Sequence, residues 1–119
     1  MPSGDKLDCV IYGDVSLDSK ELAGRIADAV GGSVDGSTVT MDVAELDIRR
    51  SDDFDPKRKA DFPDGFLYFR HRIEVYAGDS EQSGALVDLV GKLLKFLWAA
   101  GWPAVAACDF EERLPERGG

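Results

Sequence analysis

The residues of this chain that could perform covalent catalysis are its single histidine, His71, and a cysteine near its C-terminal end, Cys108. Asp109 follows Cys108 directly. A thiol, an imidazole and a carboxylate can act together when the histidine takes the proton of the nucleophile. One hypothesis is therefore a small hydrolase or esterase that uses Cys108, or a serine, with His71 and Asp109. The competing interpretation is a core histidine on an apolar strand face and a buried structural thiol.

A second group of residues combines arginines, tyrosines and acids at alternating positions of predicted strands. Alternate strand residues point to one face, so one surface could gather a binding set of Tyr12, Arg49, Tyr68, Arg70, Arg72 and Glu74, with Asp8, Asp47 and Tyr76 nearby. Three interpretations stay open: a cross-strand ion-pair network without a ligand, a protein or homodimer interface, and a small-anion site formed by Arg49, Arg70 and Arg72. Pairing of opposite charges across strands makes the first the default.

The sequence contains no common metal or cofactor motif. Cys9 and Cys108 are far apart and neither belongs to a Cys-x-x-Cys pair. The acidic residues between 52 and 64 lack the spacing of an EF-hand. No Gly-x-Ser-x-Gly elbow, phosphate-binding loop or His-Glu-x-x-His helix is present. We therefore expect no metal and no cofactor.

These residues are distributed over a regular series of predicted elements. Apolar runs and alternation predict strands at 7–12, 44–49, 66–77 and 104–108. Helices are expected at 19–30, where Asp18 and Glu21 have capping-box spacing, and at 83–100. The Asp35-Gly36 turn predicts an additional hairpin. A charged loop is expected at 51–65.

The order strand, helix, strand, strand, helix, strand predicts an α+β fold of the ferredoxin-like βαββαβ type, with the extra hairpin added. Its antiparallel sheet would carry both helices on one face and the arginines on the other. A thioredoxin-like mixed sheet is the alternative. We expect a single domain over 1–119, with frayed ends at 1–5 and 110–119.

The second predicted helix has an unusually wide apolar sector. Val87, Leu94 and Trp98 form a shoulder beside its main apolar stripe. A surface helix normally has a narrower stripe. The helix is therefore either deeply buried or uses this shoulder as a contact surface for a partner.

The charge balance excludes several classes of partner. With 14 Lys and Arg against 23 Asp and Glu, the net charge is −9, which opposes binding to nucleic acid and to anionic membranes. No leader or membrane span is visible, so a cytoplasmic location is expected. The leading hypothesis is a small, acidic, non-catalytic binding protein of immunity or accessory type, steered by charge toward a basic protein partner.

Three segments of the sequence also carry a resemblance. They are Asp52-Asp53-Phe54-Asp55, Phe62 to Phe69, and Ala104 to Glu111 with Leu114-Pro115. Together they resemble a family of small uncharacterised bacterial proteins of actinobacterial type, some of which are labelled dihydropyridine esterases. The resemblance itself implies little about activity, and it transfers no catalytic residue to this chain.

Overall fold

The described part of the chain forms a six-stranded antiparallel sheet and two helices. The computed structural model describes residues 7–41, 44–50, 69–77, 83–108 and 114. The strands are β1 (Leu7–Gly13), β2 (Ser33–Asp35), β3 (Thr38–Thr40), β4 (Ala44–Arg50), β5 (His71–Ala77) and β6 (Ala104–Cys108), and the helices are α1 (Ser19–Val30) and α2 (Ser83–Ala99). Each strand pairs antiparallel with its neighbours in the order β2-β3-β4-β5-β1-β6.

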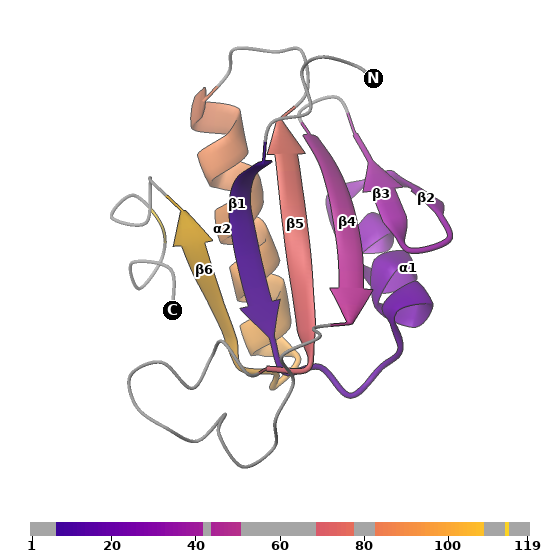
Figure 1. Ribbon diagram of the computed structural model, residues 1–119. Coiled ribbons are helices and arrows are strands. Elements are labelled where there is room, and N and C mark those ends of the chain that lie inside the picture. The colour runs from indigo at the N-terminus through magenta and orange to yellow at the C-terminus, as the bar shows by residue number, and fades with distance from the viewer. Residues whose placement is uncertain (1–6, 42–43, 51–68, 78–82, 109–113, 115–119) are drawn as a thin grey trace.

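Both helices lie on the same side of the sheet. In Figure 1 both helices stand behind the strands. α1 lies near β3 and β4, and α2 lies near β5, β1 and β6, toward the opposite edge of the sheet. Packing contacts agree, since α1 touches β3 and β4, α2 touches β6, and the helices touch each other. Within the described residues, no helix lies on the opposite side, which we call the open face.

The strand order corrects the predicted architecture in one respect. The sequence predicted a ferredoxin-like plait with an extra hairpin, but the six-strand order is not that of a four-stranded ferredoxin plait. The difference arises because the β2–β3 hairpin pairs with β4 and extends the sheet beyond it. The antiparallel α+β sheet with two helices is confirmed, and the thioredoxin-like mixed sheet is wrong.

The ends of α1 follow from its capping residues. The backbone N–H of Glu21 donates to Oδ1 of Asp18 at 2.8 Å, which satisfies one of the unpaired donors of the first turn. Gly31 ends the helix in the left-handed region, at φ 73°, a conformation that glycine adopts without a steric penalty. These contacts confirm the helix predicted at 19–30.

The strand predicted at 66–77 is shorter than expected. It begins at His71, because its partners stop there: His71 pairs with Gly13 of β1 and with Arg50 of β4. Phe69 and Arg70 lie in a bend, and residues 66–68 lie outside the described residues. Phe69 and Arg70 therefore lie outside the two ladders that β5 forms with β1 and β4.

The core fills the space between the sheet and the helices. Along β1, β4 and β5 the residues facing the helices are almost fully buried, namely Cys9, Ile11, Leu46, Ile48, Ile73 and Val75. In α2, Val87 and Leu94 are also buried, and the indole N–H of Trp98 donates to the carbonyl oxygen of Ala104 at 3.0 Å. The α2 shoulder therefore packs within the protein and leaves little accessible surface for a partner.

The predicted loop at 51–65 and the N-terminal residues 1–5 lie outside the described residues. The same holds for the predicted C-terminal tail, except Leu114. Leu114 is 5% exposed and belongs to the core cluster, and the prediction of frayed ends stays a prediction. No helix in the described ranges is both long and apolar enough to span a membrane.

Candidate functional site

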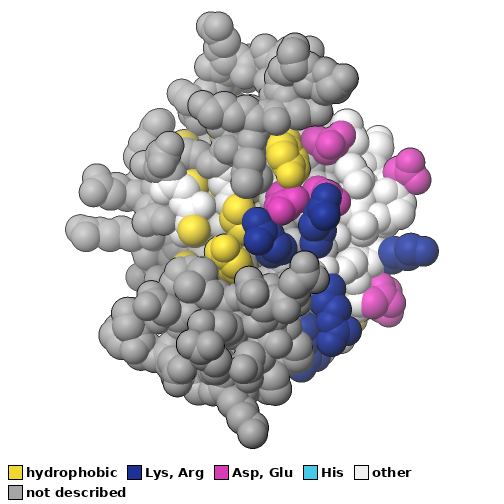
Figure 2. Space-filling view, in the orientation of Figure 1, with side chains coloured by type: hydrophobic (Ala, Val, Ile, Leu, Met, Phe, Trp, Pro, Cys, Tyr) yellow, Lys and Arg dark blue, Asp and Glu magenta, His cyan; other side chains and the backbone are white. Residues whose placement is uncertain are grey.

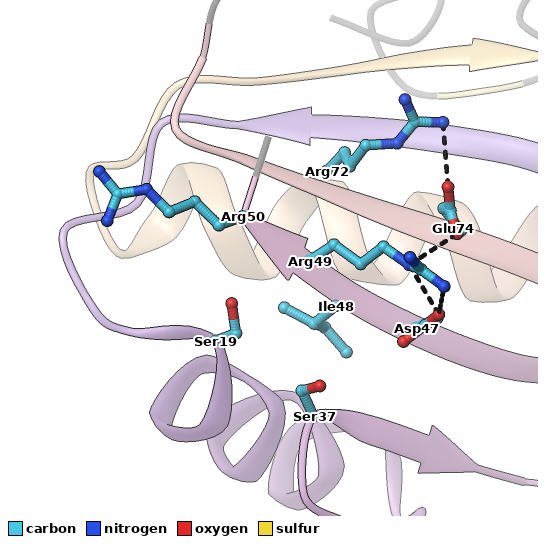
Figure 3. Close-up of a pocket in the computed structure, with 8 residues that line it drawn as sticks. All are labelled: Ser19, Ser37, Asp47, Ile48, Arg49, Arg50, Arg72 and Glu74. Carbon is cyan, nitrogen blue, oxygen red and sulfur yellow. Dashed lines mark hydrogen bonds and ion pairs between the residues drawn. The ribbon is translucent and has the colours of Figure 1, made fainter. Parts of the chain in front are cut away.

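Glu74 is the centre of a charged network on the open face. Its carboxylate lies 3.1 Å from Nε of Arg49 and 3.0 Å from a terminal nitrogen of Arg72. The hydroxyl of Tyr76 donates to the same carboxylate at 2.9 Å. These contacts join residues of β4 and β5 across the open face, as Figure 3 shows for the two arginines.

Two further contacts extend the network to its neighbours. Nε of Arg49 donates to Asp47 at 2.9 Å, and a terminal nitrogen of Arg49 lies 2.8 Å from the same oxygen. The guanidinium of Arg72 lies over the ring of Tyr12 in β1, 6.0 Å from its centroid, within the range of a cation–π contact. We call Tyr12, Asp47, Arg49, Arg72, Glu74 and Tyr76 the face network.

The strand register places like charges opposite each other, and contacts with opposite charges offset their repulsion. Arg49 lies directly opposite Arg72, and Asp47 lies directly opposite Glu74. Like charges at opposite positions repel. The diagonal contact from Arg49 to Glu74 places each arginine beside a carboxylate and offsets this repulsion.

Exposure differs sharply within the network. The Arg49 side chain is 59% exposed, whereas that of Glu74 is only 13% exposed. The hydrogen bond to Asp47 and the negative charge of Asp47 are the main causes that raise the pKa of Arg49. The charge of Glu74 adds to this shift. The hydrogen bond to Glu74 is the main cause that raises the pKa of Tyr76. Glu74 therefore orients groups that remain partly accessible to water.

A pocket of about 540 Å³ opens beside the network, between β4 and the start of α1 (Figure 3). It lies just before the first residue of β3, Thr38, because β3 pairs only with residues 45–47 of β4 and leaves residues 48–50 without this neighbour. Ser19 of α1 and Ser37 of the hairpin line one side, and the paired arginines and acids line the other. Arg50 also lines the pocket, but its side chain points away from those of Arg49 and Arg72.

Seen from the open face, the charged groups form one patch. Figure 2 shows arginine or lysine side chains and acidic side chains clustered near the centre of this face, beside apolar atoms. The predicted binding residues Tyr12, Arg49, Arg72 and Glu74 are thus brought together. Tyr68 lies outside the described residues, as does the side chain of Asp8.

Arg70 lies in a bend before β5, whereas the sequence predicted it on the strand face that carries Arg72. It precedes the first paired residue of β5, so strand alternation no longer fixes its direction. Its Nε lies 3.9 Å from a carboxylate oxygen of Asp14 in the β1–α1 connection. It lines a second pocket of about 400 Å³ with Arg50 and His71.

His71 and Cys108 are not brought together, which contradicts the proposed catalytic dyad. His71 pairs with Gly13 of β1, whereas Cys108 pairs with Cys9. Four residue steps along β1, from 9 to 13, separate these positions, or about 13 Å. Two strand spacings add roughly 10 Å in the perpendicular direction. Asp109 lies outside the described residues.

The environment of His71 lowers its pKa and so favours the neutral imidazole. The side chain is 3% exposed, and its Nδ1 makes no hydrogen bond within the described part of the chain. Burial is the main cause that lowers its pKa, and the charges of Arg50 and Arg70 act in the same direction. A hydrogen bond to the Val15 backbone and the charge of Asp14 oppose this shift.

Ser19, Ser37 and Arg50 are pocket residues that the sequence did not predict. A serine at the start of a helix and another in a turn are common for structural reasons, so neither carries a functional signal. Their grouping depends on how the β2–β3 hairpin pairs with β4. Within the described ranges, no three His, Cys, Asp or Glu side chains are grouped in a way that could hold a metal ion.

Comparison of the chain with protein-family models, with curated proteins and with solved structures found no match. The resemblance to small bacterial proteins labelled as esterases therefore stays a prediction.

Proposed function

We propose that this protein is a small, non-catalytic binding protein and that the open face is its contact surface for a protein partner. The observation that carries the proposal is the arrangement of Arg49 and Arg72. Both are held in fixed positions by the partly buried Glu74, yet Arg49 keeps more than half of its side chain exposed. Arginines oriented in this way are suited to bind a partner without the entropy cost of ordering their side chains.

The chemistry of this face favours a partner that presents carboxylates. A guanidinium has five N–H donors and binds carboxylates in a two-pronged geometry. Net charge alone favoured a basic partner, because opposite charges steer association. At the pocket, however, three arginines and two carboxylates line the wall, with the Arg50 side chain directed away from Arg49 and Arg72. Local charge at contact distance determines which group docks, so we propose an acidic segment of a partner protein as the ligand.

The added hairpin enlarges the sheet that carries this contact surface. We interpret β4-β5-β1-β6 with α1 and α2 as a ferredoxin-like unit, to which the β2–β3 hairpin adds two strands. The hairpin widens the open face and supplies Ser37 to the pocket.

A binding assay with synthetic peptides tests the proposal. We expect a hexaglutamate peptide to bind more tightly than hexalysine, and added salt to weaken binding by screening. The double variant Arg49→Gln/Arg72→Gln should raise the Kd about tenfold or more, equivalent to about 1.4 kcal/mol. Arg25→Gln is the matched control, because Arg25 is an exposed arginine of α1, on the other side of the sheet.

Four results would contradict the proposal. Hexalysine could bind as tightly as hexaglutamate, or the double variant could bind hexaglutamate unchanged. In a third result, inorganic phosphate would raise the melting temperature of the protein while neither peptide binds. This result would indicate a module that binds small anions. Reversible self-association in sedimentation experiments, lost in the double variant, would replace the partner by a second copy of the chain.

A small hydrolase is the second candidate function. It is favoured by one observation, that His71, whose pKa is lowered mainly by burial, lines a pocket with Ser16 and Ser19. A neutral imidazole can act as a general base, although the 3% exposure of His71 restricts access of a substrate. A panel of ester substrates, assayed with wild type and His71→Ala, tests this candidate. Turnover that is lost in the variant would support it.

A further inference from the structure

Two cysteines that are 99 positions apart in the sequence lie directly opposite each other in the sheet. Cys9 of β1 pairs with Cys108 of β6, at the end of the register that starts with Gly13 and Ala104. From one pair to the next, the register moves by one residue on each strand, without a bulge. The structure holds both residues as thiols.

The hydrogen-bond pattern shows what kind of pair this is. The N–H of Asp14 donates to the carbonyl oxygen of Pro103 at 2.9 Å, and these residues continue the same register by one step. Hydrogen-bonded and non-hydrogen-bonded pairs alternate along an antiparallel ladder. Cys9 and Cys108 lie five steps from Asp14 and Pro103, so they occupy a non-hydrogen-bonded position.

A non-hydrogen-bonded pair has the spacing that a disulfide requires. Directly opposite Cα atoms at such a position are about 4.5 Å apart. Disulfides span Cα distances of about 4.4–6.8 Å. Both side chains also point to one side, because directly opposite residues of paired strands share a face. A bond between the two sulfur atoms therefore needs no rearrangement of the backbone.

Burial assigns different roles to the two thiols. Cys9 is 2% exposed and belongs to the core, whereas Cys108 is only partly buried and packs against the core. A reagent dissolved in water therefore reaches Cys108 first. Cys9 lies behind it, in position to react with the sulfur of Cys108.

We propose that Cys9 and Cys108 form a redox-active pair, which an organic disulfide such as oxidised glutathione converts into a cross-strand disulfide. The Cys108 thiolate attacks one sulfur of the organic disulfide, whose S–S bond breaks and releases one thiol. The Cys9 thiolate then attacks the Cys108 sulfur of the mixed disulfide and releases the second thiol. The protein loses two protons and two electrons, which together are two hydrogen atoms, and the organic disulfide gains them as two thiols.

This pair goes beyond the proposed binding function, and it lies away from the face network. Its consequence is mechanical. β6 is an edge strand of the sheet, bonded only to β1 among the described strands, and the disulfide would tie it covalently to β1. Since the bond closes a very long loop of the unfolded chain, oxidation should raise the melting temperature.

The test is incubation of the folded protein with defined ratios of oxidised and reduced glutathione. We expect an intact mass lower by two hydrogen atoms and a peptide map that joins Cys9 to Cys108. Cys9→Ser should stop at the mixed disulfide on Cys108. The matched control is Ala107→Cys in a Cys108→Ser background, which moves the thiol by one residue and so to the other face. This control should form no bond to Cys9.

Several outcomes would overturn the proposal. Wild type could give only mixed disulfides or covalent dimers, or remain reduced at every glutathione ratio. The Ala107 control could also cross-link to Cys9 as readily as wild type, which would mean that unfolding, and not the register, brings the thiols together. The test is independent of the proposed binding function, since a failure of peptides to bind the open face would not change its result.

Discussion

The two faces of the sheet are built from the same strands and differ by a shift of one residue. On the helix-covered face, Leu46, Ile48 and Ile73 are at most 1% exposed. On the open face, their immediate neighbours Asp47, Arg49 and Glu74 form a charged network. Since alternate side chains of a strand point to opposite sides, one segment of sequence specifies both the core and the candidate site.

The energetic contributions of the two faces are also unequal. Complete burial of one isoleucine or leucine stabilises a protein by roughly 1.5–3 kcal/mol. An ion pair between partly exposed groups typically contributes about 0–1 kcal/mol. The covered face therefore accounts for folding, and the face network mainly orients its arginines. This difference leads to four predictions.

The largest effect is expected in the covered face. Ile73→Ala should lower the free energy of unfolding by about 2–5 kcal/mol, because it leaves a cavity at a fully buried position of β5. Urea unfolding measures the change. Val34→Ala is the control: Val34 is 47% exposed, so its loss should stay within about 0.5 kcal/mol. Similar losses for both variants would refute the assignment of the core to this face.

The second prediction concerns the one buried polar side chain among the described residues of the core. Burial lowers the pKa of His71 in the folded state, so the unfolded chain binds a proton first as the pH falls. Stability should be full above about pH 6.5, the ordinary pKa of histidine, and decrease as the pH falls through the lower folded pKa. His71→Gln should remove this part of the pH dependence.

Urea unfolding at about pH 7.5 and about pH 5.5 provides the measurement, since most carboxylates titrate below this window. An equal pH dependence in wild type and His71→Gln would show that the folded pKa of His71 is not lowered.

A smaller effect is expected in the face network. Glu74→Gln keeps the shape of the side chain but removes its charge, so it should cost no more than about 1 kcal/mol. High salt should reduce the difference from wild type, because it screens the ion pairs. Glu45→Gln is the matched control, since Glu45 is an exposed acid of β4 that lies opposite Tyr76. A loss as large as that of Ile73→Ala would make the network a stability element.

The smallest effect is a change in titration. Because a hydrogen bond to Glu74 is the main cause that raises the pKa of Tyr76, Glu74→Gln should lower this pKa toward its ordinary value of about 10. Ultraviolet absorbance follows the ionisation of tyrosine, and Tyr76→Phe assigns the transition. An unchanged titration curve in Glu74→Gln would show that the contact does not persist in solution.

The sequence predicted those parts of the fold that depend on local patterns. Asp18 and Gly31 bound α1 as expected, and alternation along β4 and β5 assigned Ile48 and Ile73 to the core and Arg49 and Arg72 to the other face. Such signals depend on neighbours within a few residues, so they are readable from a single chain.

Features that depend on strand register could not be predicted in this way. Arg70 was expected to lie with Arg72, but β5 begins after it because the partner strands end at Gly13 and Arg50. The pairing of Cys9 with Cys108 likewise requires the relative position of two strands from opposite ends of the chain. Sequence periodicity determines which face a residue occupies, but not which residue lies beside it.

The central claim is that the open face binds a partner and that the covered face stabilises the fold. Nuclear magnetic resonance with the hexaglutamate peptide tests this claim most directly. Backbone amide shifts should move for residues of β4 and β5 around Arg49 and Arg72, and for Ser37 at the pocket. Amides of α2 should stay unchanged. Shifts confined to the helices, or scattered evenly over both sides of the sheet, would contradict the claim.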